Sequence, residues 1–228
     1  MRVTQRLTQA RFDLYAIGTR LSMATVMSDE ISYWADLDEN VIGLVFRDTT
    51  DDDYGWSVMV RDRLGRFRGA RLNVNIKCAR RAEAELRLEI AEISRNVDIE
   101  ELGIQGDETN SAIDLLTILP GTMVEELHPY FIALLESPGR TPARAVLKEI
   151  GPWLTAADPH FVKEFQRHQF DQRLWELYIW AALREGGYDV EHVEAPDFFG
   201  FVSICEIHSR SYYHSTFSGW DTCKPPKS

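Results

Sequence analysis

The 228-residue chain has few cysteines and no long apolar segment. Its three cysteines, Cys78, Cys205 and Cys223, form no CxxC pair, and a sparse, odd set is typical of a reducing compartment rather than of a disulfide framework. The longest apolar run, from Leu177 to Leu183, is far shorter than the ~20 residues that span a bilayer. The first residues, MRVTQRLTQARFDLY, contain no apolar stretch of signal-peptide length. We therefore expect a cytoplasmic protein without a membrane segment.

Basic residues are also scarce. Lysine and arginine number 25 against 36 aspartates and glutamates, which gives a formal net charge of -11. Proteins that bind nucleic acid generally carry a basic patch, so this balance argues against a general nucleic-acid binder. It does not exclude an enzyme that meets DNA on one local face, because carboxylates that hold a metal ion add to the negative count.

Several common site motifs are missing. The chain contains no GxSxG, Walker loop or dinucleotide fingerprint. His160 and His168 lie too far apart for the i, i+4 pairing of a helical zinc site, so zinc is not expected. The acidic cluster of Asp48, Asp51, Asp52 and Asp53 lacks the glycine and terminal glutamate of a calcium loop. We interpret this cluster as a solvated hairpin loop.

Residues 31–76 carry the pattern of an antiparallel meander. Aromatic and β-branched residues fill four short stretches, and polar turns separate them. Two of these turns are predicted at residues 38–40 and 63–65. The preceding segment, residues 1–27, is ambiguous, because its apolar residues follow roughly helical spacing while Gly18 interrupts it.

Helical patterns dominate the middle of the chain. Residues 80–96 form a strong amphipathic pattern, and short helices are predicted at 124–135 and 142–153. The longest predicted helix covers residues 161–185 and ends at the glycine pair that follows. The predicted apolar stripe of the first helix consists of Ala82, Leu86, Ile90 and Ile93. On the longest helix, Trp175, Tyr178 and Trp180 are interpreted as core residues.

Two further strands are predicted after the longest helix, at residues 188–193 and 199–207. The fold class is therefore α+β, with an N-terminal antiparallel sheet plus helices and a C-terminal α/β core. The expected domains are an antiparallel-sheet and helix domain at 1–110, a helical connector at 111–160, and a helix-strand-strand core with an irregular tail at 161–228. Residues 208–228 have no clean apolar period, and we expect residues 199–228 to contribute little to the fold.

Three acids follow one another across the longest helix and these two strands. Glu176 lies in the helix, Asp197 follows the first strand and Glu206 lies in the second. Acids on one helix and two adjacent strands can converge on Mg²⁺, which takes oxygen ligands and assists attack on a phosphodiester. Each acid also has a structural alternative. Arg173 is placed to pair with Glu176, Asp197 can shape a turn, and Glu206 can protect a sheet edge.

This order of helix-Glu, strand, Pro-Asp, strand and Glu resembles the core of the PD-(D/E)XK phosphodiesterase superfamily, which includes many restriction-type nucleases. The resemblance implies a restriction-endonuclease-like α/β core that holds Mg²⁺ with Glu176, Asp197 and Glu206 and acts on DNA. The superfamily commonly has a lysine two residues after the second acid. This chain has His208 there, and His208 or a second carboxylate would orient the attacking water.

A longer part of the chain is similar to an uncharacterised bacterial protein family. The shared pattern is an FQ…FD…RLWELYL helix followed by PDF, and the similarity extends over most of residues 30–198. Beyond Phe198 the family pattern ends, and we expect that the C-terminal part has diverged or is truncated.

The leading hypothesis is a metal-dependent phosphodiesterase of the DNA endonuclease type, with catalysis expected to be impaired or absent because the segment after Glu206 is too short and irregular to complete the core. The alternative is a non-catalytic interaction module, such as a degenerate nuclease that binds a protein partner. The acidic charge, the missing lysine and the unusual tail favour this alternative. A truncated product without activity is a third reading.

Overall fold

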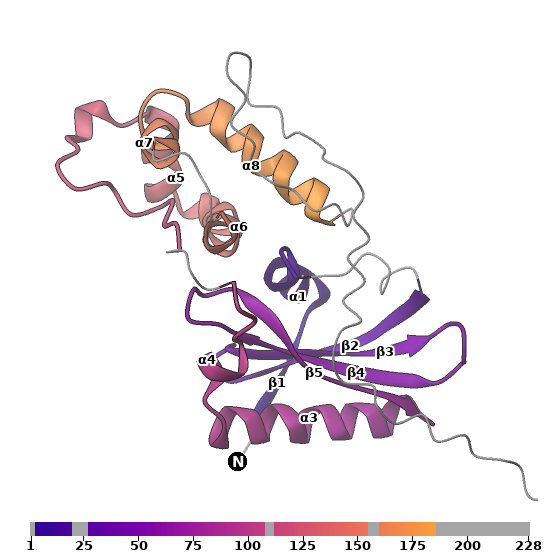
Figure 1. Cartoon of the computed structure of the whole chain (residues 1–228). Helices are drawn as coiled ribbons and strands as arrows, with labels where there is room; N and C mark the ends of the chain where they lie inside the picture. Colours follow the sequence, from indigo (N-terminus) through magenta and orange to yellow (C-terminus); the bar gives the residue numbers. More distant parts are fainter. Residues whose placement is uncertain (1–2, 20–26, 108–111, 155–159, 186–228) are drawn as a thin grey trace, which may run out of the picture.

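The structure is a computed structural model that describes residues 3–19, 27–107, 112–154 and 160–185. Its described part is α+β, with a five-stranded antiparallel sheet followed by helices (Figure 1). The strand order follows the chain, and the strands are β1 (Thr4–Leu7), β2 (Ser28–Asp36), β3 (Val41–Asp48), β4 (Tyr54–Arg61) and β5 (Phe67–Ile76). The meander predicted for residues 31–76 is confirmed. β1 extends it along the β2 edge.

The hairpin turns form where the sequence predicts them. The Asp36 carboxylate accepts two backbone N–H groups at the β2–β3 turn, and the Asp62 carboxylate accepts two at the β4–β5 turn. Glu39 and Gly65 take the positive φ angles, 56° and 87°, that let these turns close. The acidic cluster around Asp51 lies in the β3–β4 hairpin loop, as predicted, and Asp51 is exposed.

Helix α3 (Ala79–Asn96) covers one face of the sheet (Figure 1). Its predicted apolar stripe is fully buried, at 0% exposure, against valines of β3 and β4. Gly43 lets the helix approach closely, because a Cβ at this position would lie 2.6 Å from Leu86 Cδ1. The prediction of this helix and of its packing face is therefore confirmed.

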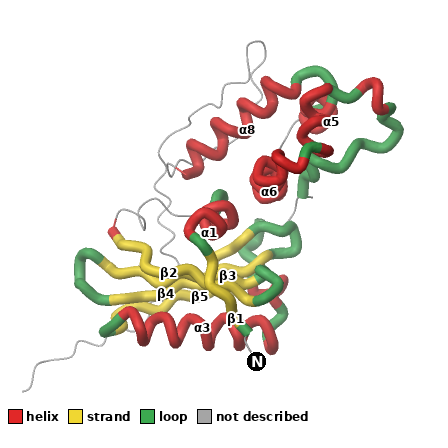
Figure 2. The backbone as a smooth tube through the Cα atoms, turned by 180° about the vertical axis from the view of Figure 1, so that it is seen from behind, coloured by secondary structure: helices red, strands yellow, loops and turns green. Residues whose placement is uncertain are grey.

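Helix α1 (Gln9–Ala16) lies against the opposite face. Phe12, Tyr15 and Ala16 pack with apolar side chains of the sheet, among them Phe67. The helical spacing of the first residues includes Leu7, but Leu7 lies in β1, so this short segment contains a strand and a helix. Both views place α1 between the sheet and the later helices (Figure 2).

Helix α4 (Ile99–Leu102) packs against the core that α3 forms with the sheet. The described helices of residues 124–185 gather beyond α1 (Figure 1). Their aromatic core contains Phe131, Phe165 and Phe170, whose ring centroids lie 5.1–6.4 Å apart.

No helix in the described ranges is both long and apolar enough to cross a membrane. The elements are α4 (Ile99–Leu102), η1 (Val124–Glu126), α5 (Pro129–Glu136), η2 (Pro138–Arg140), α6 (Thr141–Ile150), η3 (Gly151–Trp153), α7 (Phe161–Gln166) and α8 (Phe170–Glu185).

The single helix predicted for residues 161–185 is two helices, α7 and α8. The break follows Gln166, whose side chain is fully buried and bonds to the backbone of Leu115, Thr117 and Leu119. The Gln166 carbonyl accepts the backbone N–H of His128 at 2.9 Å. A continuous helix would direct that carbonyl to the residue four positions later, so tertiary hydrogen bonding ends α7 here.

The predicted C-terminal α/β core is not present in the part of the chain that the structure describes. Its two predicted strands, at residues 188–193 and 199–207, lie outside the described residues, as does the tail at 199–228.

Candidate functional site

Glu176 lies on α8 in a fixed ion-pair network. Arg173 Nη1 donates to Glu176 Oε2 at 2.7 Å, and Arg173 Nε donates to Glu164 Oε2 at 3.0 Å. The side chains of Arg173 and Glu176 are 13% and 18% exposed. Burial alone would lower the Arg173 pKa, but its bonds to the two glutamates outweigh burial and raise it. The ion pair with Arg173, predicted as the structural alternative for Glu176, is therefore confirmed.

The other predicted site residues, Asp197, Glu206 and His208, lie outside the described residues. The structure thus brings Glu176 together with Glu164, a residue that the sequence did not single out. Across residues 3–19, 27–107, 112–154 and 160–185, no group of three or more histidines, cysteines, aspartates or glutamates is placed to hold a metal ion.

The outer surface of α8 is aromatic. Trp175 and Tyr178 are each 61% exposed, and their rings stack with centroids 5.4 Å apart. The prediction that both belong to the core is wrong, whereas Trp180 packs partly buried against the helical core. The core side of α8 is occupied by Phe170 and Leu177, which leaves Trp175 and Tyr178 on the other side of the helix.

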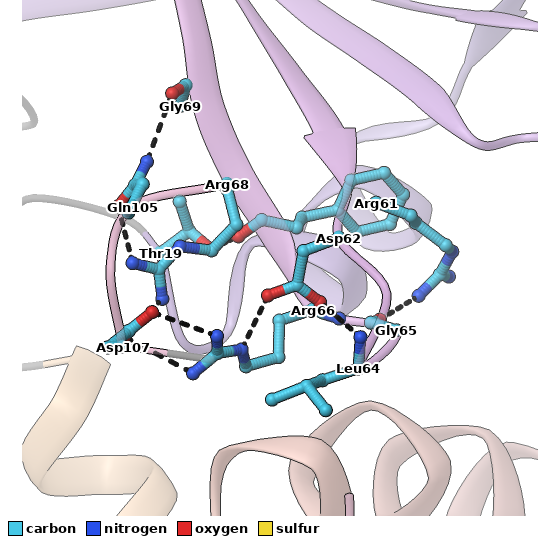
Figure 3. Close-up of polar contacts among 11 residues, drawn as sticks. Thr19, Arg61, Asp62, Leu64, Gly65, Arg66, Arg68, Gly69, Gln105 and Asp107 are labelled. Atoms are coloured by element: carbon cyan, nitrogen blue, oxygen red, sulfur yellow. Dashed lines mark hydrogen bonds and ion pairs between the residues drawn. The ribbon is translucent and has the colours of Figure 1, made fainter. Parts of the chain in front are cut away.

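A second constellation, which the sequence did not reveal, surrounds the start of β5 (Figure 3). Arg66 Nε donates to Asp62 Oδ2 at 2.7 Å, and its terminal nitrogens donate to both Asp107 oxygens at 3.0 and 3.3 Å. Arg68 Nη1 also donates to Asp107 Oδ2, at 3.0 Å, and Arg68 Nη2 donates to Gln105. Two buried guanidinium groups therefore hold one carboxylate from the segment that follows α4.

The indole of Trp153 supports these arginines. The guanidinium carbons of Arg66 and Arg68 lie 5.3 and 5.4 Å from its ring centroid, within the range of cation–π attraction. Arg184, near the end of α8, approaches the same ring at 5.7 Å and donates to the Gly18 carbonyl at 2.9 Å. Trp153 thus links the sheet, the segment after α1 and the end of α8.

The burial of this constellation is uneven. The side chains of Asp62 and Arg66 are 0% and 2% exposed, and Arg68 is 9% exposed, but Asp107 is 51% exposed. Burial by itself would raise the pKa of Asp107, but the charges of Arg68 and Arg66 and their hydrogen bonds lower it. The ionised carboxylate of Asp107 therefore binds the two buried arginines from the solvent side.

The sequence contains one signal for this constellation. Arg66 and Arg68 are two residues apart around the start of β5, and alternate strand residues share one face. Their partner Asp107 follows 41 residues after Arg66, a separation that no local pattern bridges. In comparisons with known proteins, no family model, no curated protein and no solved structure matches this chain significantly.

Proposed function

We propose that the protein is a metal-dependent phosphodiesterase that acts on DNA. Glu176, Asp197 and Glu206 hold Mg²⁺, and His208 or a second carboxylate orients the attacking water. The order of these residues along the chain, and its resemblance to the PD-(D/E)XK superfamily, support the proposal. One structural observation supports the proposal: Glu176 lies on α8, the last described helix before Asp197, Glu206 and His208 in the chain.

The state of Glu176 fits an accessory acid at such a centre. A carboxylate oxygen is a ligand that Mg²⁺ prefers. Arg173 Nη1 donates to Glu176 Oε2 and holds the side chain in place. When bound, Mg²⁺ activates water and stabilises the charge that develops on a phosphodiester under attack. Arg173 holds the Glu176 carboxylate through Oε2, one of its two oxygens.

The test is cleavage of plasmid DNA by the purified full-length protein with Mg²⁺ or Mn²⁺. The proposal expects cleavage that is lost in Asp197→Ala and strongly reduced in Glu176→Gln. Glu125→Gln is the matched control, because Glu125 is an exposed acid on η1. Equal cleavage by the wild type and Asp197→Ala would identify a contaminant. No cleavage in any sample would reject the enzyme and leave the interaction module as the better proposal.

The second proposal is a non-catalytic module that binds a protein partner. The exposed stack of Trp175 and Tyr178 favours it, because tyrosine and tryptophan are enriched at protein–protein interfaces. A paired pull-down with wild-type protein and Trp175→Ala/Tyr178→Ala tests it. A partner that only the wild type retains supports this function, and identical captures argue against it.

A further inference from the structure

Two carboxylates neutralise the arginines at the start of β5, and these two carboxylates differ in burial. Asp62 is 0% exposed, accepts backbone N–H groups of its own turn and fixes Arg66 through Nε. Asp107 is 51% exposed and belongs to a different segment, yet it occupies three N–H donors of Arg66 and Arg68. Asp62 therefore belongs to the fixed turn, whereas Asp107 reaches the arginines from the solvent side.

The segment that delivers Asp107 is attached mainly by polar contacts. Ile104 is 55% exposed, and Gly106 takes a positive φ angle of 86°. Gln105 Nε2 donates to the Gly69 carbonyl at 3.1 Å, and its oxygen accepts from Arg68 (Figure 3). A segment with so little apolar burial separates from the sheet at lower cost than a core element.

We propose that Arg66 and Arg68 form a binding site for a phosphate group, and that Asp107 occupies this site as an internal substitute for the ligand. The two guanidinium groups present three N–H donors to the two oxygens of one carboxylate, with distances of 3.0–3.3 Å. Planar guanidinium groups bind phosphate oxygens in the same manner, and a phosphate carries more charge than a carboxylate.

The surroundings prepare the two arginines for this role. Asp62 directs Arg66 through its Nε, which leaves both terminal nitrogens for the ligand. Trp153 supports both guanidinium groups and contributes an apolar wall. Asp107 is the carboxylate that pairs with the buried guanidinium of Arg68, and Gln105, its other partner, lies in the same segment. When that segment separates, the charge of Arg68 is left without an ion-pair partner among the described residues. A buried guanidinium without an ion-pair partner is energetically unfavourable. An anion that binds there therefore gains the electrostatic attraction that Asp107 provided.

Competition with Asp107 sets the expected affinity. A tethered carboxylate acts at an effective concentration on the order of millimolar, so phosphate binds the wild-type protein only weakly. Removing the Asp107 charge removes this competitor. The site is proposed independently of the nuclease function. The phosphate group it takes belongs either to a nucleotide or to a nucleic-acid backbone.

The experiment titrates inorganic phosphate into the full-length protein by calorimetry at constant ionic strength, with chloride as the reference anion. Asp107→Asn keeps the size of the side chain and removes its charge. Asp51→Asn is the matched control. It makes the same change of charge in the exposed β3–β4 loop, at the other end of β4 from the arginines. The expected result is a Kd for phosphate at least tenfold lower in Asp107→Asn than in the wild type or Asp51→Asn. Thermal melts check that each variant is folded.

A second variant ties the effect to the arginines. Arg68→Gln in the Asp107→Asn background removes one guanidinium without leaving a new unpaired carboxylate, and it should abolish the gained binding. Equal phosphate binding by Asp107→Asn and Asp51→Asn, or persistent binding without Arg68, would overturn the proposal. A nucleoside monophosphate and a short oligonucleotide without terminal phosphates, titrated in parallel, identify which source of phosphate the site prefers. The titrations measure phosphate binding and the plasmid assay measures cleavage, so failure of the nuclease proposal and failure of this one are distinguishable.

Discussion

The guanidinium of Arg61, at the end of β4, forms two parallel hydrogen bonds with the carboxylate of Glu149 near the end of α6. Nη1 lies 3.0 Å from Oε2 and Nη2 lies 2.8 Å from Oε1, and 88 positions separate the two residues in the chain. Glu149 is 9% exposed and Arg61 is 24% exposed. This pair joins the sheet to the helices, and its two-pronged geometry is the strong form of an arginine–carboxylate contact.

Neutralising one partner should therefore weaken the fold. We expect Glu149→Gln to lower the free energy of unfolding by about 2 kcal/mol, because a charged hydrogen-bond pair becomes a neutral one beside a half-buried guanidinium. Urea denaturation of wild type and variant measures the difference. Glu125→Gln, at an exposed position on η1, is expected to change stability by about 0.5 kcal/mol or less. Equal effects of the two substitutions would show that the pair adds no stability.

The buried Gly18 is expected to tolerate no side chain. A Cβ built on Gly18 would lie 2.2–2.5 Å from three atoms of the Trp153 ring, so alanine forces the indole or the backbone to move. We expect Gly18→Ala to cost about 1–3 kcal/mol of folding stability, as overpacked sites do. Gly139→Ala is the control, because a Cβ there meets nothing within 4 Å. Thermal and urea melts of both variants measure the difference. A Gly18→Ala protein as stable as the control would contradict the close packing of Gly18 against the Trp153 ring.

Local periodic patterns explain what the sequence predicted well. The alternation within residues 31–76 and the apolar stripe at Leu86, Ile90 and Ile93 each require one buried face, and the structure provides α3 on the sheet for both. The predicted turns coincide with residues that hydrogen-bond their own backbone or adopt a positive φ. These features depend on neighbours in sequence, so the sequence alone indicates them.

Features that depend on distant partners were missed or misplaced. β1 has four residues, too few for a period to be recognised. The end of α7 depends on a bond between the Gln166 carbonyl and His128, and the arginine constellation depends on Asp107. Of the proposed metal site, the structure describes only Glu176, and it shows the ion pair that the sequence offered as the alternative.

The corrected position of Trp175 leads to a direct test on α8. Trp175 is 61% exposed and Leu177 is 2% exposed, two positions apart on the same helix. We expect Trp175→Ala to lower the free energy of unfolding by about 1 kcal/mol, mainly through loss of its stacking on Tyr178. Leu177→Ala should cost about 2–5 kcal/mol, as truncations of buried leucine do. A large loss of folding stability in Trp175→Ala would show that this side chain is buried in the core.

Tyr15 and Glu39 should give the protein an unusual titration at high pH. The Tyr15 hydroxyl donates to Glu39 Oε2, which also accepts from Arg11 at 2.6 Å. Burial, and then the bond to Glu39, raise the pKa of Tyr15 from 10.0 to about 12. Because the folded pKa lies above the unfolded value, the stabilising contribution of Tyr15 is complete below pH 10.0 and is lost as the pH rises through about 12.

Glu39 behaves in the opposite sense. Burial would raise its pKa, but the bonds from Tyr15 and Arg11 outweigh burial and lower it below 4.5. Its contribution to stability is therefore present above pH 4.5 and is lost as the pH falls through the lowered value. Acid unfolding of Glu39→Gln should accordingly be less steep in this range than acid unfolding of the wild type.

The Tyr15 titration is measured by the near-ultraviolet absorbance of tyrosinate, as the difference between wild type and Tyr15→Phe. We expect this difference to appear at about pH 12, with circular dichroism recorded in parallel to follow unfolding. Glu39→Gln should move the transition toward pH 10.0 without reaching it, because burial, the larger cause of the raised pKa, remains. A difference that titrates at pH 10.0 in the folded wild-type protein would mean that Tyr15 is neither buried nor bonded to Glu39 in the β2–β3 turn.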